Sequence, residues 1–183
     1  MRDIALIGRA RSGKDSVGAR LIARYGYTRL AFADPLKDMA IGINPWISYD
    51  VPGFIKHGTI RLADLIEHVG WERAKEEYSE VRSTLQRIGQ HMRSIDPDYW
   101  IDRLTKRLAR TSGPIVVTDV RYPNEVDKLD RYGFRIVRIA RPSIESTDAH
   151  ESETALDKYV APVTVTNSGT LDDLHAHADT LPH

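Results

Sequence analysis

The stretch "IALIGRARSGKDS", Ile4 to Ser16, decides the fold. It begins with the apolar run "IALIG", typical of a buried strand, and a helical pattern extends from Gly13 to about Tyr25. Between strand and helix, Gly8-x4-Gly13-Lys14 matches the phosphate-loop pattern up to its last position. Glycines let backbone N–H groups close around phosphate oxygens, and the helix N-terminus adds a favourable dipole. The sequence therefore predicts a phosphate-binding loop in which Lys14 reaches the β- and γ-phosphates.

Asp15 departs from that pattern, because the residue after the lysine is usually a Ser or Thr whose hydroxyl ligates Mg²⁺. Three roles are open for its carboxylate: holding a Mg²⁺-bound water, facing a second substrate or an arginine, or complementing the helix dipole. Ser16, about 100° further round the helix, is the nearest hydroxyl. Asp119 ends the apolar run "IVVTD" and is either a further metal ligand or a turn residue. The candidate Mg²⁺ ligands are therefore Asp15, Ser16 and Asp119, and Arg121 would lie near the phosphoryl charge.

Four further strands are expected outward from this loop. Their residue ranges are 28–33, 115–119, 134–140 and 163–166. Helical patterns separate most of them, which is the signature of an α/β fold with a parallel sheet. Thr170, three residues before Asp173, indicates a helix N-terminus in the tail.

The middle of the chain, about residues 36–111, reads as a helical insertion without strands on a single domain of residues 1–183. Within it, residues 44–58 are expected to form an irregular loop. Residues 80–95 combine two stripes at helical spacing. The apolar stripe contains Val81, Leu85, Ile88, Met92 and Ile95, and the polar stripe beside it contains Arg82, Gln86, Gly89 and Arg93. The polar stripe is either a solvated face or the lining of a cleft for a phosphate and a base, and Trp100 is either a stacking surface or core.

Two later segments are polar. Residues 138–154 contain Arg138, Arg141, His150 and Glu153, and form either a mobile lid over the phosphates or an ordinary surface loop. Residues 166–170, "TNSGT", follow the last expected strand, where a loop could wrap a purine ring.

Composition narrows the classes of function. The formal net charge is zero, which argues against a protein that binds nucleic acid through a basic surface. Arginine makes up 19 of the 26 basic residues, and its planar fork suits bidentate phosphate contacts. The chain has no cysteine, and no segment reads as a signal peptide or a membrane span. We therefore expect a cytoplasmic protein without disulfides.

Several motifs together resemble the deoxynucleoside monophosphate kinases of tailed phages. They are "GRARSGKDS", "FADPLK", "GWERAKEEYSEVRSTLQRIGQHMR", "DPDYW", "VTDVRYPNE", "RPSIESTDAHESE" and "TNSGT", in the family's order through nearly the whole chain. The family's loop usually reads "GKD" followed by Thr or Ser. "GQH" at Gly89 departs from the family, where a small residue is expected after the glycine, and this puts the shape of the base pocket in doubt.

The resemblance implies a three-layer nucleoside monophosphate kinase fold, with sheet order 2-3-1-4-5 and a lid at about residues 141–158. The implied substrates are ATP and a deoxynucleoside monophosphate, with Mg²⁺ as the cofactor. No membrane or nucleic acid is expected as a partner, and a homodimer is left open. The implied location is the host cytoplasm if the chain is phage-encoded. The residues implied to act in catalysis are Lys14, Asp15, Arg121 and Arg141. Those implied to bind ATP are Gly8, Arg11, Ser12, Gly13, Lys14, Asp15, Ser16, Arg138, Asn167, Gly169 and Thr170. Those implied to bind the monophosphate are Asp34, Lys37, Arg82, Gln86, Arg93 and Trp100, and those of the lid are Arg141, His150 and Glu153.

Three alternatives remain. A kinase of another phosphorylated metabolite, of the dephospho-coenzyme A or phosphomevalonate type, would share the core and differ at the acceptor. A nucleotide-dependent switch would need no second phosphate pocket, and the arginine stripe speaks against it. A DNA-binding structural protein is opposed by the zero net charge.

Overall fold

A computed structural model describes residues 1–50, 57–142 and 151–183. Contacts divide the chain into two compact units. The first unit contains Met1–Phe32 and Ile101–His183, and the second contains Ala33–Trp100. The insertion predicted at about residues 36–111 thus overlaps largely with the second unit, which begins at Ala33 and ends at Trp100.

The first unit is built on a five-stranded parallel sheet with the order β2-β5-β1-β6-β7. Its strands are β1 (Ile4–Ile7), β2 (Thr28–Leu30), β5 (Ile115–Val120), β6 (Arg135–Ala140) and β7 (Val163–Thr166). Counted within this sheet alone, the order is 2-3-1-4-5, so the predicted α/β fold and strand order are confirmed. All four residues of β1 are fully buried, as a central strand covered on both faces requires.

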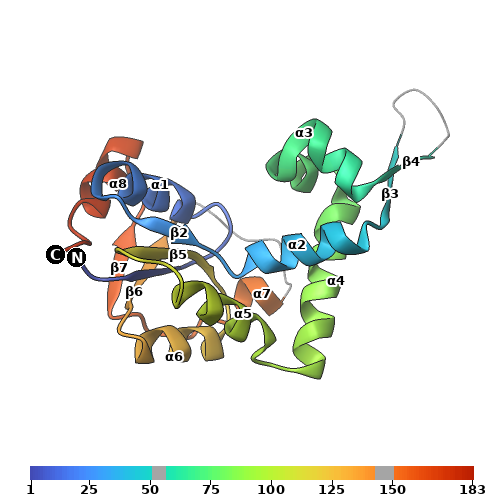
Figure 1. The fold of residues 1–183 in the computed structure, drawn as a ribbon. Coiled ribbons are helices and arrows are strands. Elements are labelled where there is room, and N and C mark those ends of the chain that lie inside the picture. Colours follow the sequence, from blue (N-terminus) through green and yellow to red (C-terminus); the bar gives the residue numbers. More distant parts are fainter. Residues whose placement is uncertain (51–56, 143–150) are drawn as a thin grey trace. The chain divides into compact units, whose positions relative to one another are not determined.

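Helices cover both faces of this sheet (Figure 1). On one face lie α1 (Lys14–Tyr25) and α8 (Leu171–Ala178), and on the other lie α5 (Tyr99–Leu108) and α6 (Pro123–Arg131). The short helix α7 (Glu151–Thr154) precedes β7. The predicted start of α8 is confirmed, because the Thr170 hydroxyl accepts the N–H of Asp173 at 3.2 Å.

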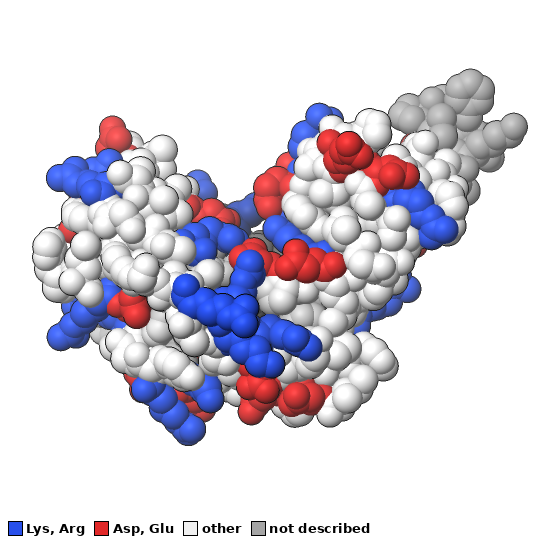
Figure 2. Space-filling view, viewed as in Figure 1, with Lys and Arg blue, Asp and Glu red and all other residues white. Residues whose placement is uncertain are grey.

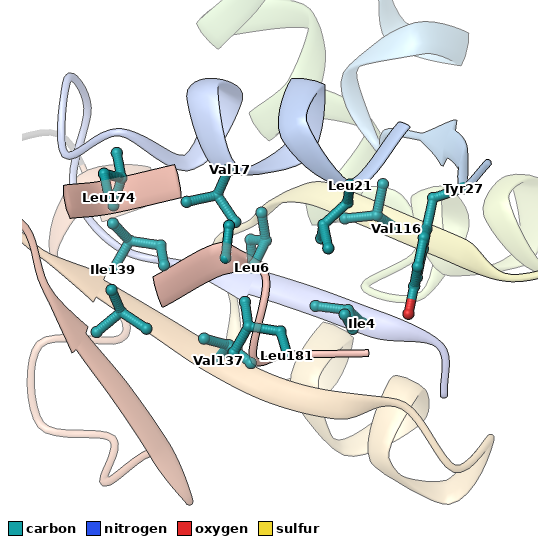
Figure 3. Close-up of a cluster of buried hydrophobic side chains, with 12 residues drawn as sticks. Ile4, Leu6, Val17, Leu21, Tyr27, Val116, Val137, Ile139, Leu174 and Leu181 are labelled. Atoms are coloured by element: carbon teal, nitrogen blue, oxygen red, sulfur yellow. The ribbon is translucent and has the colours of Figure 1, made fainter. Parts of the chain in front are cut away.

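The core between the sheet and the α1–α8 face is apolar (Figure 3). Alternate strand residues point to the same side, so Ile4 and Leu6 of β1 meet Val137 and Ile139 of β6 there. From above, α1 contributes Val17 and Leu21 and α8 contributes Leu174. This packing fixes the position of α1, and with it the loop that joins β1 to α1.

The described residues of the second unit form three helices and an antiparallel pair of strands. Its elements are α2 (Ala33–Ile43), β3 (Trp46–Asp50), β4 (His57–Arg61), α3 (Leu62–Glu77) and α4 (Ser79–Ile95). Both α2 and α3 pack against α4 around Ala40, Leu62 and Val81. Figure 2 shows basic and acidic side chains on the face in view, including one contiguous group of basic side chains.

Two predictions for the second unit were wrong. The segment expected as an irregular loop contains β3 and the first two residues of β4, and these strands pair antiparallel with Ile47 opposite Ile60. Ile47 is fully buried, so the hairpin supplies core to this unit, and the prediction failed because Pro and Gly outweighed the short strand pattern. The apolar stripe also ends early, since Ile95 in the last turn of α4 is 67% exposed.

Candidate functional site

The loop between β1 and α1 has the backbone conformation that its glycines allow. Gly8 has φ 141° and Gly13 has φ 108°, values that side chains rarely tolerate. A Cβ at Gly8 would collide with the carbonyl oxygen of Ile139 on β6. A Cβ at Gly13 would lie 2.7 Å from the Asn167 amide nitrogen. The strand–loop–helix arrangement expected from the sequence is therefore present.

Lys14 begins α1 and lies across this loop, only 7% exposed. Its ammonium donates to the carbonyl oxygens of Gly8 at 2.7 Å and Arg9 at 2.8 Å. Burial, followed by the charge of Arg121, lowers the pKa of Lys14 to about 8 against the opposing effect of Asp15 and Asp119. The two carboxylates and Arg121 therefore act electrostatically on Lys14.

A cavity of about 310 Å³ opens beside the loop within the first unit. It is lined by Arg11, Gly13, Lys14, Asp15, Ser16, Arg141, Asn167, Gly169, Thr170, Leu171 and Leu174. Most of the residues implied to bind ATP are thus brought together from the loop, the end of β6 and the segment between β7 and α8. A concave site with backbone amides and a lysine at a helix N-terminus can bind a phosphate chain.

Three residues of the predicted ATP set, Gly8, Ser12 and Arg138, are not among those that line this cavity. The guanidinium of Arg138 on β6 donates to the carbonyl oxygens of Leu156 at 2.8 Å and Tyr159 at 2.7 Å. These hydrogen bonds attach the segment after α7 to β6. With Gly8, it lines a second pocket of about 10 Å³, which is the size of one water molecule. Ser12 is 3% exposed, and its hydroxyl has no hydrogen-bond partner within the described residues. Arg138 therefore joins segments of the chain through its hydrogen bonds, and its assignment to ATP binding stays a prediction.

Arg9 makes a contact that sequence reasoning missed. Its guanidinium donates to both carboxylate oxygens of Asp157, at 3.2 and 2.7 Å, and ties the loop to the segment after α7. Arg9 occupies a variable position of the motif, and Asp157 follows 148 residues later. No local signal could have paired them.

Asp119 lies on β5, where one carboxylate oxygen accepts the N–H of Phe32 at 2.9 Å. Asp15 and Ser16 lie in the first turn of α1 and line the cavity. Among the described residues, no three His, Asp or Glu side chains gather as a metal site. This oxygen donor set fits Mg²⁺, which commonly takes one or two carboxylates and completes its shell with water and substrate phosphates.

Arg121 directly follows β5, in a loop whose backbone is hydrogen-bonded to the side chain of Glu125. The fully buried Glu125 carboxylate accepts the N–H groups of Arg121 at 2.8 Å and Tyr122 at 3.2 Å. The guanidinium of Arg121 donates to the carbonyl oxygen of Ser152 at 3.3 Å. Glu125 was also missed, although Pro123 at the start of α6 with Glu two residues later was a helix-start signal.

The predicted lid is described in part. Arg141 lines the cavity directly after β6, and α7 lies inside the expected range. His150 lies outside the described residues, as does the side chain of Glu153. The assignment of these two residues to a lid stays a prediction.

The residues predicted to bind a monophosphate lie in the second unit. Asp34 and Lys37 are on α2, and Arg82, Gln86 and Arg93 are on α4, which packs against α2. The Lys37 ammonium lies 5.4 Å from the centroid of the Trp71 ring. A Cβ added at Gly89 would lie 3.6 Å from the side chain of Leu36.

Trp100 is core rather than a stacking surface. Trp100 is only 2% exposed, and its indole N–H donates to the carbonyl oxygen of Gly89 at 3.2 Å. The edge of its ring meets Tyr99, with the ring centroids 4.9 Å apart. The prediction that Trp100 binds a nucleotide is therefore corrected, because burial leaves no ring face for a base.

The family model described as deoxynucleotide monophosphate kinase matches residues 55–178. The chain belongs to this family. The match spans α3, α4 and the Arg121 loop and extends to the end of α8, so it includes parts of both units. The predicted class of enzyme, a nucleotide kinase, is confirmed at the level of the family.

Relatives of this deoxynucleotide monophosphate kinase family member are distant. A protein of Acanthamoeba polyphaga mimivirus is 24% identical, over 94% of this chain and 92% of its own length. The deoxynucleotide monophosphate kinase of Enterobacteria phage T4 is 27% identical over 62% of this chain, and that of Escherichia phage RB69 is 25% identical over 55%. These matches span 47% and 44% of the two phage proteins, less than half of either.

Among solved structures, the crystal structure of TT1252 from Thermus thermophilus aligns with all of this chain and 98% of its own. The TM-score is 0.49 and the sequences are 17% identical. In the described segments of the chain, every helix is too short or too polar to cross a bilayer.

Proposed function

We propose that this family member transfers the γ-phosphoryl group of Mg-ATP to the 5′-phosphate of a deoxynucleoside monophosphate. The observation that supports it is the cavity beside the β1–α1 loop, which gathers backbone amides, Lys14 and Arg141 around one space. Such a site suits a triphosphate, because several positive charges and N–H groups converge where phosphate oxygens would lie.

In the proposed reaction, an oxygen of the acceptor phosphate attacks the γ-phosphorus, and the bond between that phosphorus and the β–γ bridging oxygen breaks. ADP and a deoxynucleoside diphosphate are the products. This chemistry needs positioning and charge stabilisation more than covalent participation. Lys14 and Arg121 would stabilise the transferred charge, and the buried Glu125 would hold the backbone of Arg121 in place.

Mg²⁺ would be held by Asp15 or Ser16 with Asp119, together with the phosphates, and it would neutralise their charge. The acceptor would be held by the α2 and α4 residues: Asp34, Lys37, Arg82, Gln86 and Arg93.

The test is ADP release from Mg-ATP in the presence of a panel of acceptors. The panel contains deoxynucleoside and ribonucleoside monophosphates, with dephospho-coenzyme A as the acceptor of the rival kinase. We expect release to depend on a deoxynucleotide, and Lys14→Ala to reduce turnover severely without unfolding the protein. Release with dephospho-coenzyme A alone would replace the proposed substrate, and ATP binding without stimulation by any acceptor would favour the switch.

A further inference from the structure

Asn167 is fixed at both its backbone and its side chain. It follows β7 directly, and its backbone N–H donates to the carbonyl oxygen of Ala140 at 2.7 Å. Its side-chain amide donates to the carbonyl oxygen of Ser12 at 2.9 Å, in the middle of the phosphate loop. The side chain therefore joins two segments that are 155 residues apart.

The hydrogen bond to Ser12 sets the direction of the next N–H group. The described peptide bonds are all trans, and a trans peptide directs its C=O and its N–H to opposite sides. Because the Ser12 C=O is drawn to Asn167, the N–H of Gly13 is directed away from Asn167. Backbone N–H groups of this loop are the groups that a phosphate would contact.

The packing at Gly13 shows that this attachment is close. A Cβ on Gly13 would lie 2.7 Å from the Asn167 amide nitrogen and 3.0 Å from a methyl group of Leu174. Only a residue without a side chain lets Asn167 approach the loop to hydrogen-bonding distance. The N–H donor of the Asn167 side-chain amide is therefore used in a hydrogen bond to the loop.

We propose that Asn167 is a positioning residue of the phosphate loop: its amide fixes the Ser12–Gly13 peptide so that the Gly13 N–H is held ready for a phosphate oxygen. The proposal rests on the proposed function, since it assumes that the loop binds the phosphates of the donor. A positioning role differs from a contact with the base, because removal of the amide should then weaken the binding of phosphates whether or not a base is attached to them.

The test compares ADP with inorganic tripolyphosphate, which has phosphates and no base. Binding of each is measured calorimetrically for the wild type, Asn167→Ala and Asn167→Leu, together with the melting temperature. The leucine is neutral, is close to asparagine in size and has no donor, so it decides the question if the alanine variant does not fold. Thr164→Ala, at an exposed position on the preceding strand β7, is the control.

We expect both variants to bind ADP and tripolyphosphate about tenfold or more weakly, with nearly equal factors for the two ligands. Binding of a deoxynucleoside monophosphate should stay as in the wild type, which a general loss of structure would not allow. A loss for ADP with unchanged tripolyphosphate binding would overturn the proposal and make Asn167 a base contact. Unchanged binding of both would also overturn it, whereas a wild type that binds neither ligand would refute the proposed function itself.

Discussion

Lys14 is the residue whose charge the phosphate loop controls most directly. Its ammonium is buried against the loop carbonyls, and burial is the largest cause of its lowered pKa. A bound phosphate chain would favour the charged form, so nucleotide affinity is coupled to the protonation of this side chain.

We therefore expect the affinity for ADP to fall as the pH rises through about 8, the pKa of Lys14 in the unliganded protein. The sign follows from the lowered pKa: below it the ammonium is present, and above it the neutral amine attracts phosphate less. Calorimetry from about pH 7 to about pH 9.5 measures this, with Lys14→Ala as the variant that should show no such slope. A flat wild-type profile would remove Lys14 from the phosphate contacts.

Arg93 tests the assignment of the acceptor at the scale of one side chain. Arg93→Ala should raise the KM for the monophosphate roughly 10- to 100-fold, because a charged hydrogen bond to phosphate is lost, and should leave the KM for ATP almost unchanged. The matched control is Arg87→Ala on the same helix, whose guanidinium donates to the Thr84 hydroxyl at 3.2 Å. Equal losses for both substrates would place Arg93 outside the acceptor site.

At the scale of elements, Trp100 joins the start of α5 to α4 through the Gly89 carbonyl. Trp100→Phe removes the indole N–H and keeps an aromatic ring, so we expect the free energy of unfolding to fall by about 1 kcal/mol. The preference among acceptor bases should not change, since the ring is core. Urea denaturation and the acceptor panel measure the two effects, and a changed order of bases would restore Trp100 to the site.

Elements with a strong local pattern could be predicted from the sequence. The apolar run of β1, the glycines of the loop and the Thr170–Asp173 helix start are all encoded within a few residues, and each is present. The β3–β4 hairpin was missed because its strand pattern is short and depends on packing for its stability. Arg9 with Asp157 and Arg138 with Tyr159 could not be predicted, because those contacts depend on the fold and not on spacing.

At the scale of the whole molecule, the α1–α8 core should limit the stability of the first unit. Leu21→Ala, at a fully buried position, should cost about 2–5 kcal/mol because it leaves a cavity beneath α1. Ile22→Ala, one position along the same helix and 39% exposed in the native protein, should cost about 0.5 kcal/mol or less. Thermal and urea unfolding of the two variants compare them directly, and equal losses would contradict this account of the core.

The second unit is a single insertion, entered after Phe32 and left at Ile101, and all five strands of the parallel sheet lie outside it. Exchange of residues 33–100 between homologues would therefore preserve the strand order and every residue that lines the cavity beside the β1–α1 loop. Under the proposed function, acceptor choice would diverge in an evolving lineage by changes confined to this one module, while the residues proposed to bind the common donor are inherited intact. Chimeras that swap only this segment would show whether base preference travels with it.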